Sequence, residues 1–204
     1  MDRVCVYAGS NPGTDPAYAD GARALAGELA DRGIGLVYGG GKVGLMGVIA
    51  DAVLAAGGEA IGVMPQALID REIGHPGLTE LKVVGSMHER KALMAELAGA
   101  FVALPGGIGT LEELIEVYTW SQLGIHDKAC GLLNVRGYYD DLAAFLDHAV
   151  SAGFLRTQHR AVLSVAEDPA ELLDALAAFQ PPRVRKWLEL DQTGRRPETA
   201  PPDR

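Results

Sequence analysis

The chain has 204 residues, a length that suits one α/β domain with a sizeable buried core. Hydrophobic residues make up 48% of the sequence, which excludes an intrinsically disordered protein. The formal net charge of -9 argues against binding to nucleic-acid polymers, because basic side chains are what neutralise polymer phosphates. A single mononucleotide needs only a few local donors, so a small nucleotide ligand stays open.

The cysteines and the apolar runs bear on the compartment. Cys5 and Cys130 both lie in apolar runs, which favours reduced core residues over a disulfide or a metal pair. No apolar run approaches the roughly 18 residues that a membrane span needs, so we expect no membrane partner. An apolar run begins after three residues, which leaves no room for a signal peptide. These features predict a cytoplasmic protein.

Short apolar runs alternate along the chain with longer segments of helical periodicity. In chain order the pattern predicts a strand at 4–8, a helix at 16–31, a strand at 35–38, a helix at 45–56, strands at 60–64 and 81–84, a helix at 86–98, a strand at 100–104, a helix at 110–123, a strand at 129–134, and helices at 138–152 and 169–179. Each predicted strand is short and apolar on both faces, as a central parallel strand should be. We therefore predict an α/β, Rossmann-like three-layer fold with a central parallel sheet and helices on both faces.

The composition changes at Pro181. We predict one Rossmann-like domain over residues 1–180 and a C-terminal extension over residues 181–204. Trp187 and Leu188 could dock a final short helix, whereas the residues from Asp191 onward hold almost no apolar side chains. That end of the extension is expected to be mobile.

Glycine-rich or polar segments fall at the carboxyl ends of four predicted strands, at residues 9–13, 39–47, 86–91 and 105–113. In a Rossmann-like sheet ligands bind at this edge, where glycines let backbone amides approach a ligand and helix N-termini supply donors for an anion. The glycines at 39, 41 and 44 match the dinucleotide fingerprint, and Glu59 lies at about the right spacing for a ribose contact. The match is weak because the fingerprint belongs on the first βα turn.

The segment 105–113 is more specific. Pro105 ends a strand, three glycines follow within four residues, and Thr110 is placed to begin a helix. Thr110 and Glu113 have the spacing of a capping box, so one interpretation is purely structural. The other places a phosphate on the amides of Gly107, Gly109 and Thr110, with Glu113 one turn further on, beside the ribose. An acid there could stabilise the positive charge that develops at the anomeric carbon.

Arg90 and Lys91 stand near the start of the helix predicted at 86–98. A solvated basic pair is the plain interpretation. However, a helix that begins at the carboxyl end of a strand directs its first turns into the crevice, where an arginine can bind phosphate through two hydrogen bonds. Histidine, cysteine and acidic residues show no metal-ligand spacing, so we expect no metal site.

Two segments together resemble the paired signature of the LONELY GUY family: Met87-His88-Glu89-Arg90-Lys91 and Pro105-Gly106-Gly107-Ile108-Gly109-Thr110-Leu111-Glu112-Glu113. The resemblance extends over nearly everything from Val4 to about Leu163, with shorter matches at 9–11, 38–41, 44–47, 71–73 and 124–128. Members of this family are cytokinin riboside 5'-monophosphate phosphoribohydrolases, often labelled lysine decarboxylases. No lysine here stands in an identifiable pyridoxal-phosphate site, so we expect no such cofactor.

The resemblance implies that Arg90 and Glu113, rather than Glu112, form a catalytic pair. It also implies a set of residues that contact the nucleotide: Glu72, Arg90, Lys91, Gly107, Ile108, Gly109, Thr110, Leu111, Glu112, Glu113 and Thr119. We expect Gly40 and Gly41, or Ser10, to assist in holding the phosphate.

The expected reaction is hydrolysis of the N-glycosidic bond of an N6-modified AMP, or of AMP itself, without a cofactor. The resemblance further implies homodimers with the site close to the subunit interface, and hexamers in some members. Three alternatives stay open at this point: a non-catalytic nucleotide-binding or carrier protein, an NAD-dependent oxidoreductase of Rossmann fold, and the decarboxylase of the older label.

Overall fold

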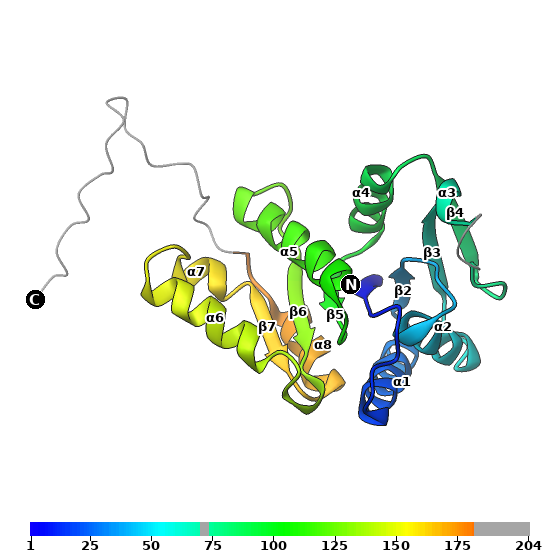
Figure 1. The fold of residues 1–204 in the computed structure, drawn as a ribbon, viewed down its shortest axis with the longest axis horizontal. Helices are drawn as coiled ribbons and strands as arrows, with labels where there is room; N and C mark the ends of the chain where they lie inside the picture. Colours follow the sequence, from blue (N-terminus) through cyan, green and yellow to red (C-terminus); the bar gives the residue numbers. More distant parts are fainter. Residues whose placement is uncertain (70–73, 182–204) are drawn as a thin grey trace, which may run out of the picture.

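The computed structural model describes residues 1–69 and 74–181. These residues form a seven-stranded sheet in which every pairing is parallel, with helices on both faces (Figure 1). The strand order is β4-β3-β2-β1-β5-β6-β7. This confirms the predicted α/β, Rossmann-like three-layer fold. The C-terminal extension from residue 182 onward and the predicted ligand Glu72 lie outside the described residues.

The elements follow the predicted alternation closely. The strands are β1 (Arg3–Tyr7), β2 (Gly35–Tyr38), β3 (Ala60–Pro65), β4 (Glu80–Val84), β5 (Ala100–Ala103), β6 (Ala129–Leu133) and β7 (Leu163–Ala166). The helices are α1 (Pro16–Asp31), α2 (Gly44–Ala55), α3 (Gln66–Ile69), α4 (Met87–Leu97), α5 (Ile108–Leu123), α6 (Asp140–Ser151), α7 (Thr157–Arg160) and α8 (Pro169–Ala178), with a 3-10 turn η1 (Val135–Gly137). Each predicted element is present within two residues of its expected bounds.

Both faces of the sheet are apolar because successive side chains of a strand point to opposite faces. On β1, Val4 and Val6 join one core with α1, α2 and α8, whereas Cys5 and Tyr7 join a second core with α4, α5 and α6. Cys5 and Cys130 are buried and free, as predicted. Burial raises the pKa of the Cys130 thiol to about 12, so this cysteine is a packing residue rather than a nucleophile.

Three short elements and one strand position differ from the prediction. The four-residue helices α3 and α7 are too short for periodicity to reveal them, and the edge strand β7 is partly exposed and contains a serine. Strand β4 was expected to be central, but it forms the other edge of the sheet, and its Val83 is 52% exposed.

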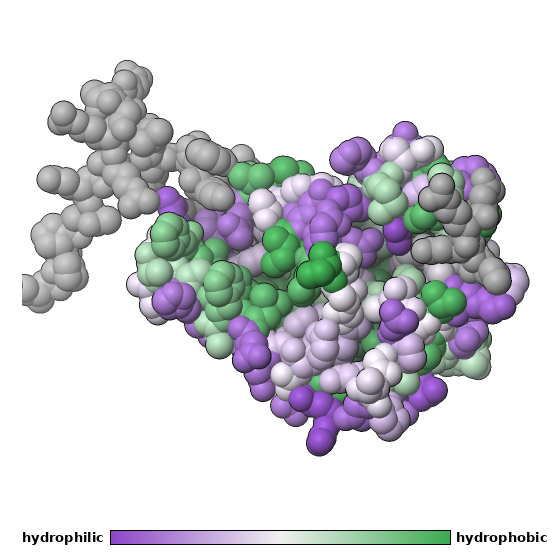
Figure 2. All heavy atoms as spheres, in the orientation of Figure 1, coloured by the Kyte–Doolittle hydropathy of each residue, from purple (hydrophilic) through white to green (hydrophobic). Residues whose placement is uncertain are grey.

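Apolar side chains also gather over α6 and the residues after it in Figure 2, where Phe145 and Phe154 are exposed.

The strand order fixes where a ligand can bind. The chain leaves β1 through α1 to reach β2 on one side, and it returns from β4 through α4 to place β5 on the other side of β1. The loops that follow β1 and β5 therefore diverge and leave a crevice between them, which is the usual ligand position in sheets of this kind. Among the described residues, no helix combines the length and the apolar content that crossing a membrane requires.

Candidate active site

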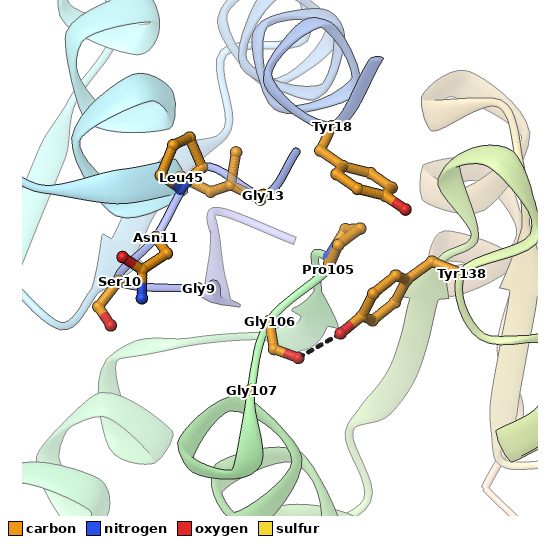
Figure 3. A pocket seen from close by; sticks show the side chains of 11 residues that line it. Gly9, Ser10, Asn11, Gly13, Tyr18, Leu45, Pro105, Gly106, Gly107 and Tyr138 are labelled. Carbon is orange, nitrogen blue, oxygen red and sulfur yellow. Dashed lines mark hydrogen bonds between the residues drawn. The ribbon is translucent and has the colours of Figure 1, made fainter. Parts of the chain in front are cut away.

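A pocket of about 250 Å³ lies in this crevice, between the loop after β1 and the turn after β5 (Figure 3). Ser10 and Asn11 stand on one side of it, and the rings of Tyr18 and Tyr138 stand on the other. The remaining lining residues are Gly9, Pro12, Gly13, Leu45, Pro105, Gly106 and Gly107. The pocket thus joins the predicted site segment 9–13 to residues 105–107 of the segment 105–113, and Arg90 and Glu113 are not among its lining residues.

The turn after β5 leads directly into α5, which begins at Ile108. The capping-box interpretation of Thr110 and Glu113 is wrong: the N-cap is Gly107, which has no side chain to satisfy the first amides. The first intrahelical hydrogen bond runs from the Leu111 amide to the Gly107 carbonyl oxygen at 3.2 Å. The amides of the first turn are therefore available to an anion.

Thr110 has a packing role instead. Its side chain is buried beneath the turn, and a Cβ on Gly106 would overlap its Oγ1 atom. The same Cβ would lie 2.9 Å from the Gly9 amide nitrogen, and the Gly9 amide donates to the Pro105 carbonyl oxygen at 3.1 Å. Only glycine fits at position 106, and the first residues of the β1 and β5 loops pack against each other here, at the base of the crevice.

Arg90 and Glu113 meet across α4 and α5. Their closest atoms, Arg90 Nη2 and Glu113 Oε1, are 3.7 Å apart, and their side chains are 12% and 15% exposed. Arg90 Nη2 also donates to the Gly39 carbonyl oxygen over a long 3.5 Å, and Nε is buried without a hydrogen-bond partner in the part of the chain that the structure describes. Buried polar groups are normally satisfied, so this guanidinium keeps donor capacity for a ligand.

Burial also controls the charge of Glu113. Removal from solvent raises the pKa of this carboxyl group, while the nearby Arg90 guanidinium lowers it, and the net result is a raised pKa. A desolvated carboxylate opposite a guanidinium interacts strongly with any charge that develops between them.

Gly39 shapes the Arg90 position. A Cβ on Gly39 would overlap Arg90 Nη2 and lie 3.3 Å from Arg90 Cζ, and the nearest atom of another residue, Met46 Sδ, would be 3.5 Å away. The missing side chain at Gly39 therefore leaves room for the Arg90 guanidinium next to the carboxyl end of β2.

We expect Gly39→Ala to lower kcat/KM by about a hundredfold, because a displacement of a reacting group by about 1 Å can cost that much. The Gly39 backbone is not left-handed, so the fold should persist. Steady-state kinetics together with the melting temperature check this. The matched control is Gly27→Ala in α1, where an added Cβ meets nothing within 4 Å and activity should be unchanged. Wild-type activity in the Gly39 variant would contradict the proposed packing against Arg90.

Lys91 is held by two acids of α5. Its Nζ atom lies 2.6 Å from Glu112 Oε1 and 3.0 Å from Glu116 Oε2. The hydrogen bond to Glu112 raises the pKa of Lys91, which therefore stays charged. These ion pairs tie α4 to α5 next to the Arg90 and Glu113 pair. Contacts of Lys91 and Glu112 with a nucleotide stay predictions.

The other predicted ligands lie at varying distances from this centre. Ser10 is exposed at the pocket, and Gly44 packs so closely against its carbonyl group that a Cβ would overlap it. Gly40 and Gly41 are buried within the loop after β2 and do not line the pocket, and their contact with a phosphate stays a prediction. Thr119 is six residues beyond Glu113 on α5, about 9 Å along the helix axis. The structure does not bring Thr119 to the pair, and its nucleotide contact stays a prediction.

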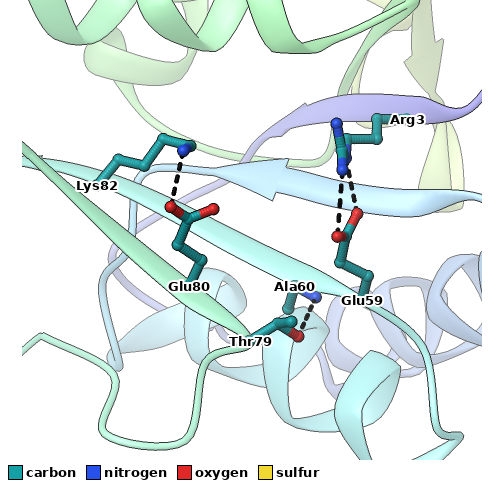
Figure 4. Close-up of polar contacts among 6 residues, drawn as sticks. All are labelled: Arg3, Glu59, Ala60, Thr79, Glu80 and Lys82. Atoms are coloured by element: carbon teal, nitrogen blue, oxygen red, sulfur yellow. Dashed lines mark hydrogen bonds and ion pairs between the residues drawn. The ribbon is translucent and has the colours of Figure 1, made fainter.

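The structure does not support the dinucleotide fingerprint. Glu59 precedes β3, the neighbour of β2, and so lies at the amino end of the strands, whereas the glycines follow the carboxyl end of β2. There it pairs with Arg3, with Arg3 Nε and Glu59 Oε2 2.6 Å apart (Figure 4). Glu59 therefore cannot reach a ribose held at residues 39–44. It cannot supply the ribose contact on which the NAD-dependent oxidoreductase alternative depends.

Two pocket residues, Tyr18 and Tyr138, were not predicted as site residues. Their rings meet edge to face with centroids 5.6 Å apart. Tyr138 was expected inside the helix 138–152, but α6 begins at Asp140, because Arg136 and Gly137 adopt left-handed backbone conformations with φ of 57° and 70°. The paired tyrosines directly after a glycine were the only signal in the sequence.

Comparison with known proteins adds evidence beyond this geometry. A family model described as a possible lysine decarboxylase matches residues 46–176. The chain is 48% identical over 199 residues to the cytokinin riboside 5'-monophosphate phosphoribohydrolase LOG1 of Arabidopsis thaliana. The matched region covers 96% of this chain and 93% of that protein. It is 50% identical over 195 residues to the probable phosphoribohydrolase LOGL2 of Oryza sativa subsp. japonica, covering 93% of this chain and 80% of that protein.

A solved structure supports the fold. The molybdenum cofactor carrier protein of Chlamydomonas reinhardtii superposes with a TM-score of 0.66 at 22% identity, over 87% of this chain and 96% of that one. At this identity the similarity concerns the architecture alone. The sequence relatives carry the family assignment, and they confirm the resemblance noted at residues 87–91 and 105–113. The chain belongs to the family of the cytokinin riboside 5'-monophosphate phosphoribohydrolases.

Proposed function

We propose that this chain hydrolyses the N-glycosidic bond of an N6-modified adenosine 5'-monophosphate, or of AMP itself, releasing the free base and ribose 5-phosphate. The observation that carries the proposal is the buried pair of Arg90 and Glu113 beside the uncapped first turn of α5. The 48% and 50% identical relatives are named for this activity.

The phosphate binds at the start of α5. Its oxygens accept hydrogen bonds from amides of residues 107–110, where the helix dipole favours negative charge. Ser10 stands across the same pocket and can donate through its hydroxyl group. Glu113 lies five residues after Ile108, about 7.5 Å along the helix axis. A nucleotide anchored by its phosphate thus extends its ribose toward Glu113.

Glu113 acts on the ribose. As the bond between the anomeric carbon and the base breaks, the base keeps the electron pair and the sugar gains positive charge. The buried carboxylate stabilises that charge and orients the attacking water. The water oxygen bonds to the anomeric carbon, and a proton from water compensates the charge on the departing base.

Arg90 acts on the substrate as a fixed positive charge. Its guanidinium stays protonated, so it does not serve as a general acid. Its free donors position the substrate and stabilise negative charge on the departing side. The pairing with Glu113 keeps both groups oriented before the substrate arrives.

The raised pKa of Glu113 predicts the shape of the pH profile. The carboxylate is the active form, so kcat/KM should rise with pH and level off only above the ordinary range of a glutamate carboxyl group. A pH series of kcat/KM for wild type and Glu113→Gln checks this. The acidic limb should vanish from the residual activity of the variant. An unchanged limb in that variant would assign it to another group.

The experiment that tests the function incubates the purified chain with AMP and with isopentenyladenosine monophosphate. Free base and ribose 5-phosphate are then quantified by chromatography. Release of both products in equal amounts supports the proposal, and the two rates rank the substrates. Nucleotide binding without base release would indicate a carrier protein of the same fold.

We also propose that the chain acts as a cytoplasmic homodimer, as its family resemblance implies. A mostly apolar hollow between α4 and the end of α5 supports a subunit contact there, and Trp120 and Ile125 line it. Ile125 is 64% exposed in the single chain. Light scattering on the purified protein over a range of concentrations tests the assembly and separates a dimer from a hexamer.

A further inference from the structure

Four successive carbonyl oxygens of the turn after β5 accept hydrogen bonds from the protein. The donors to residues 104, 105, 106 and 107 are, in order, Tyr139 Oη at 2.6 Å, the Gly9 amide at 3.1 Å, Tyr138 Oη at 2.6 Å and the Leu111 amide at 3.2 Å. Two of the four donors are therefore the hydroxyl groups of adjacent tyrosines. Figure 3 shows the bond from Tyr138 at the edge of the pocket.

The bond to the Gly106 carbonyl has a consequence for the neighbouring donor. The peptide between Gly106 and Gly107 is trans, so its N–H points opposite to its C=O. The Gly106 carbonyl oxygen points toward the Tyr138 hydroxyl group that donates to it, so the Gly107 N–H points away from Tyr138. A peptide between two glycines can rotate at little steric cost, and a Cβ on Gly107 would meet nothing within 4 Å. Packing therefore restrains this peptide at Gly106 but leaves it open on the Gly107 side.

The Tyr138 side chain is itself held in place. Its ring packs edge to face against Tyr18 and Tyr139, with centroids 5.6 and 4.9 Å away. The left-handed pair at Arg136 and Gly137 turns the chain so that both tyrosines face back toward the β5 loop. A non-glycine residue in that conformation is strained, which is expected where a local geometry serves a site.

We propose that Tyr138 is a positioning residue for the phosphate of the substrate. Its hydroxyl group fixes the Gly106–Gly107 peptide so that the Gly107 N–H stays directed at the anion. The inference rests on the proposed function for the identity of the ligand. It adds a residue outside the paired signature at 87–91 and 105–113, and it assigns that residue to binding of the 5'-phosphate rather than to breaking of the glycosidic bond.

Tyr139 provides a matched control within the same loop. Its hydroxyl group also binds a carbonyl oxygen at 2.6 Å, but the peptide concerned joins Leu104 to Pro105, and proline has no N–H. Loss of that bond therefore reorients no donor. Tyr139 is 2% exposed, so Tyr139→Phe leaves a buried carbonyl group without its partner and should destabilise the fold.

The test compares Tyr138→Phe with Tyr139→Phe by calorimetric titration of ribose 5-phosphate and adenosine, and of AMP with each substitution combined with Glu113→Gln so that hydrolysis is slow during the titration. We expect Tyr138→Phe to weaken the binding of ribose 5-phosphate and AMP about three- to tenfold, which is the range of one neutral hydrogen bond. The affinity for adenosine, which has no phosphate, should be unchanged. In turnover assays KM should rise by the same factor with kcat unchanged, as for contacts made equally in ground and transition states. Tyr139→Phe should lower the melting temperature and keep wild-type affinity for ribose 5-phosphate.

The outcomes separate this inference from the proposed function. Wild-type ribose 5-phosphate affinity in Tyr138→Phe, or an equal loss in Tyr139→Phe, would overturn the positioning role. If the wild type binds ribose 5-phosphate but releases no base, the proposed function fails while the comparison of the two variants still decides the role of Tyr138. If the wild type binds neither ribose 5-phosphate nor AMP, both are overturned.

Discussion

Replacing Glu113 with glutamine is expected to lower kcat by about a hundredfold to a thousandfold, the usual effect of removing one group that stabilises transition-state charge. Glutamine keeps the size of the side chain and removes its charge. Binding of AMP should change far less than turnover, because the phosphate is held by the amides at the start of α5. Single-turnover measurement of base release together with AMP titration checks both halves of this expectation.

The variant should also be at least as stable as the wild type at neutral pH. The native state raises the pKa of Glu113, so it binds the proton more tightly than the unfolded chain does, and stability falls as pH rises through that window. Glutamine avoids this cost of ionisation. The matched control is Glu116→Gln, one turn further along α5, which faces Lys91 rather than Arg90. Equal losses of turnover in both variants would argue against a specific role for Glu113.

Replacing Arg90 with alanine is expected to lower kcat/KM by a similar factor, about a hundredfold or more. The guanidinium has capacity for ligand hydrogen bonds, since its own contacts with Gly39 and Glu113 are long. Lysine should restore little of the loss, because it cannot reproduce the planar, forked donor arrangement. Initial rates of base release over a range of substrate concentrations measure the effect.

The control for Arg90 is Arg160, another largely buried arginine. Arg160 binds Asp147 and the Leu163 carbonyl oxygen, away from the pocket. Arg160→Ala should lower stability and leave kcat/KM near its wild-type value. Near wild-type base release by Arg90→Ala would refute its assignment to the reaction.

The sequence was most informative where a single physical signal dominates. Buried parallel strands are short apolar runs, so the six predicted strands were found nearly at their bounds. Strand β7 was missed because it is a partly exposed edge strand with a serine in it. The capping box at Thr110 and Glu113 was misleading, because the helix begins two residues earlier and buries both side chains for other purposes.

The site itself depends on contacts that spacing cannot reveal. Arg90 and Glu113 meet because α4 crosses the sheet and β5 pairs with β1, and Gly39 leaves room for the guanidinium. Glu59 had a suitable spacing from the glycines at 39–44 but lies at the amino end of the strands, away from the carboxyl end that carries the glycines. Tyr138 was hidden because its role depends on two left-handed residues that interrupt an otherwise helical pattern.

The most direct test of this account is a crystal structure of the Glu113→Gln variant with AMP bound. We predict that the phosphate lies on the amides of residues 107–110, between the β1 and β5 loops, with the ribose beside residue 113 and the Arg90 guanidinium within hydrogen-bond distance of the nucleotide. A nucleotide bound elsewhere, or one whose glycosidic bond faces away from residues 90 and 113, would contradict the proposed site.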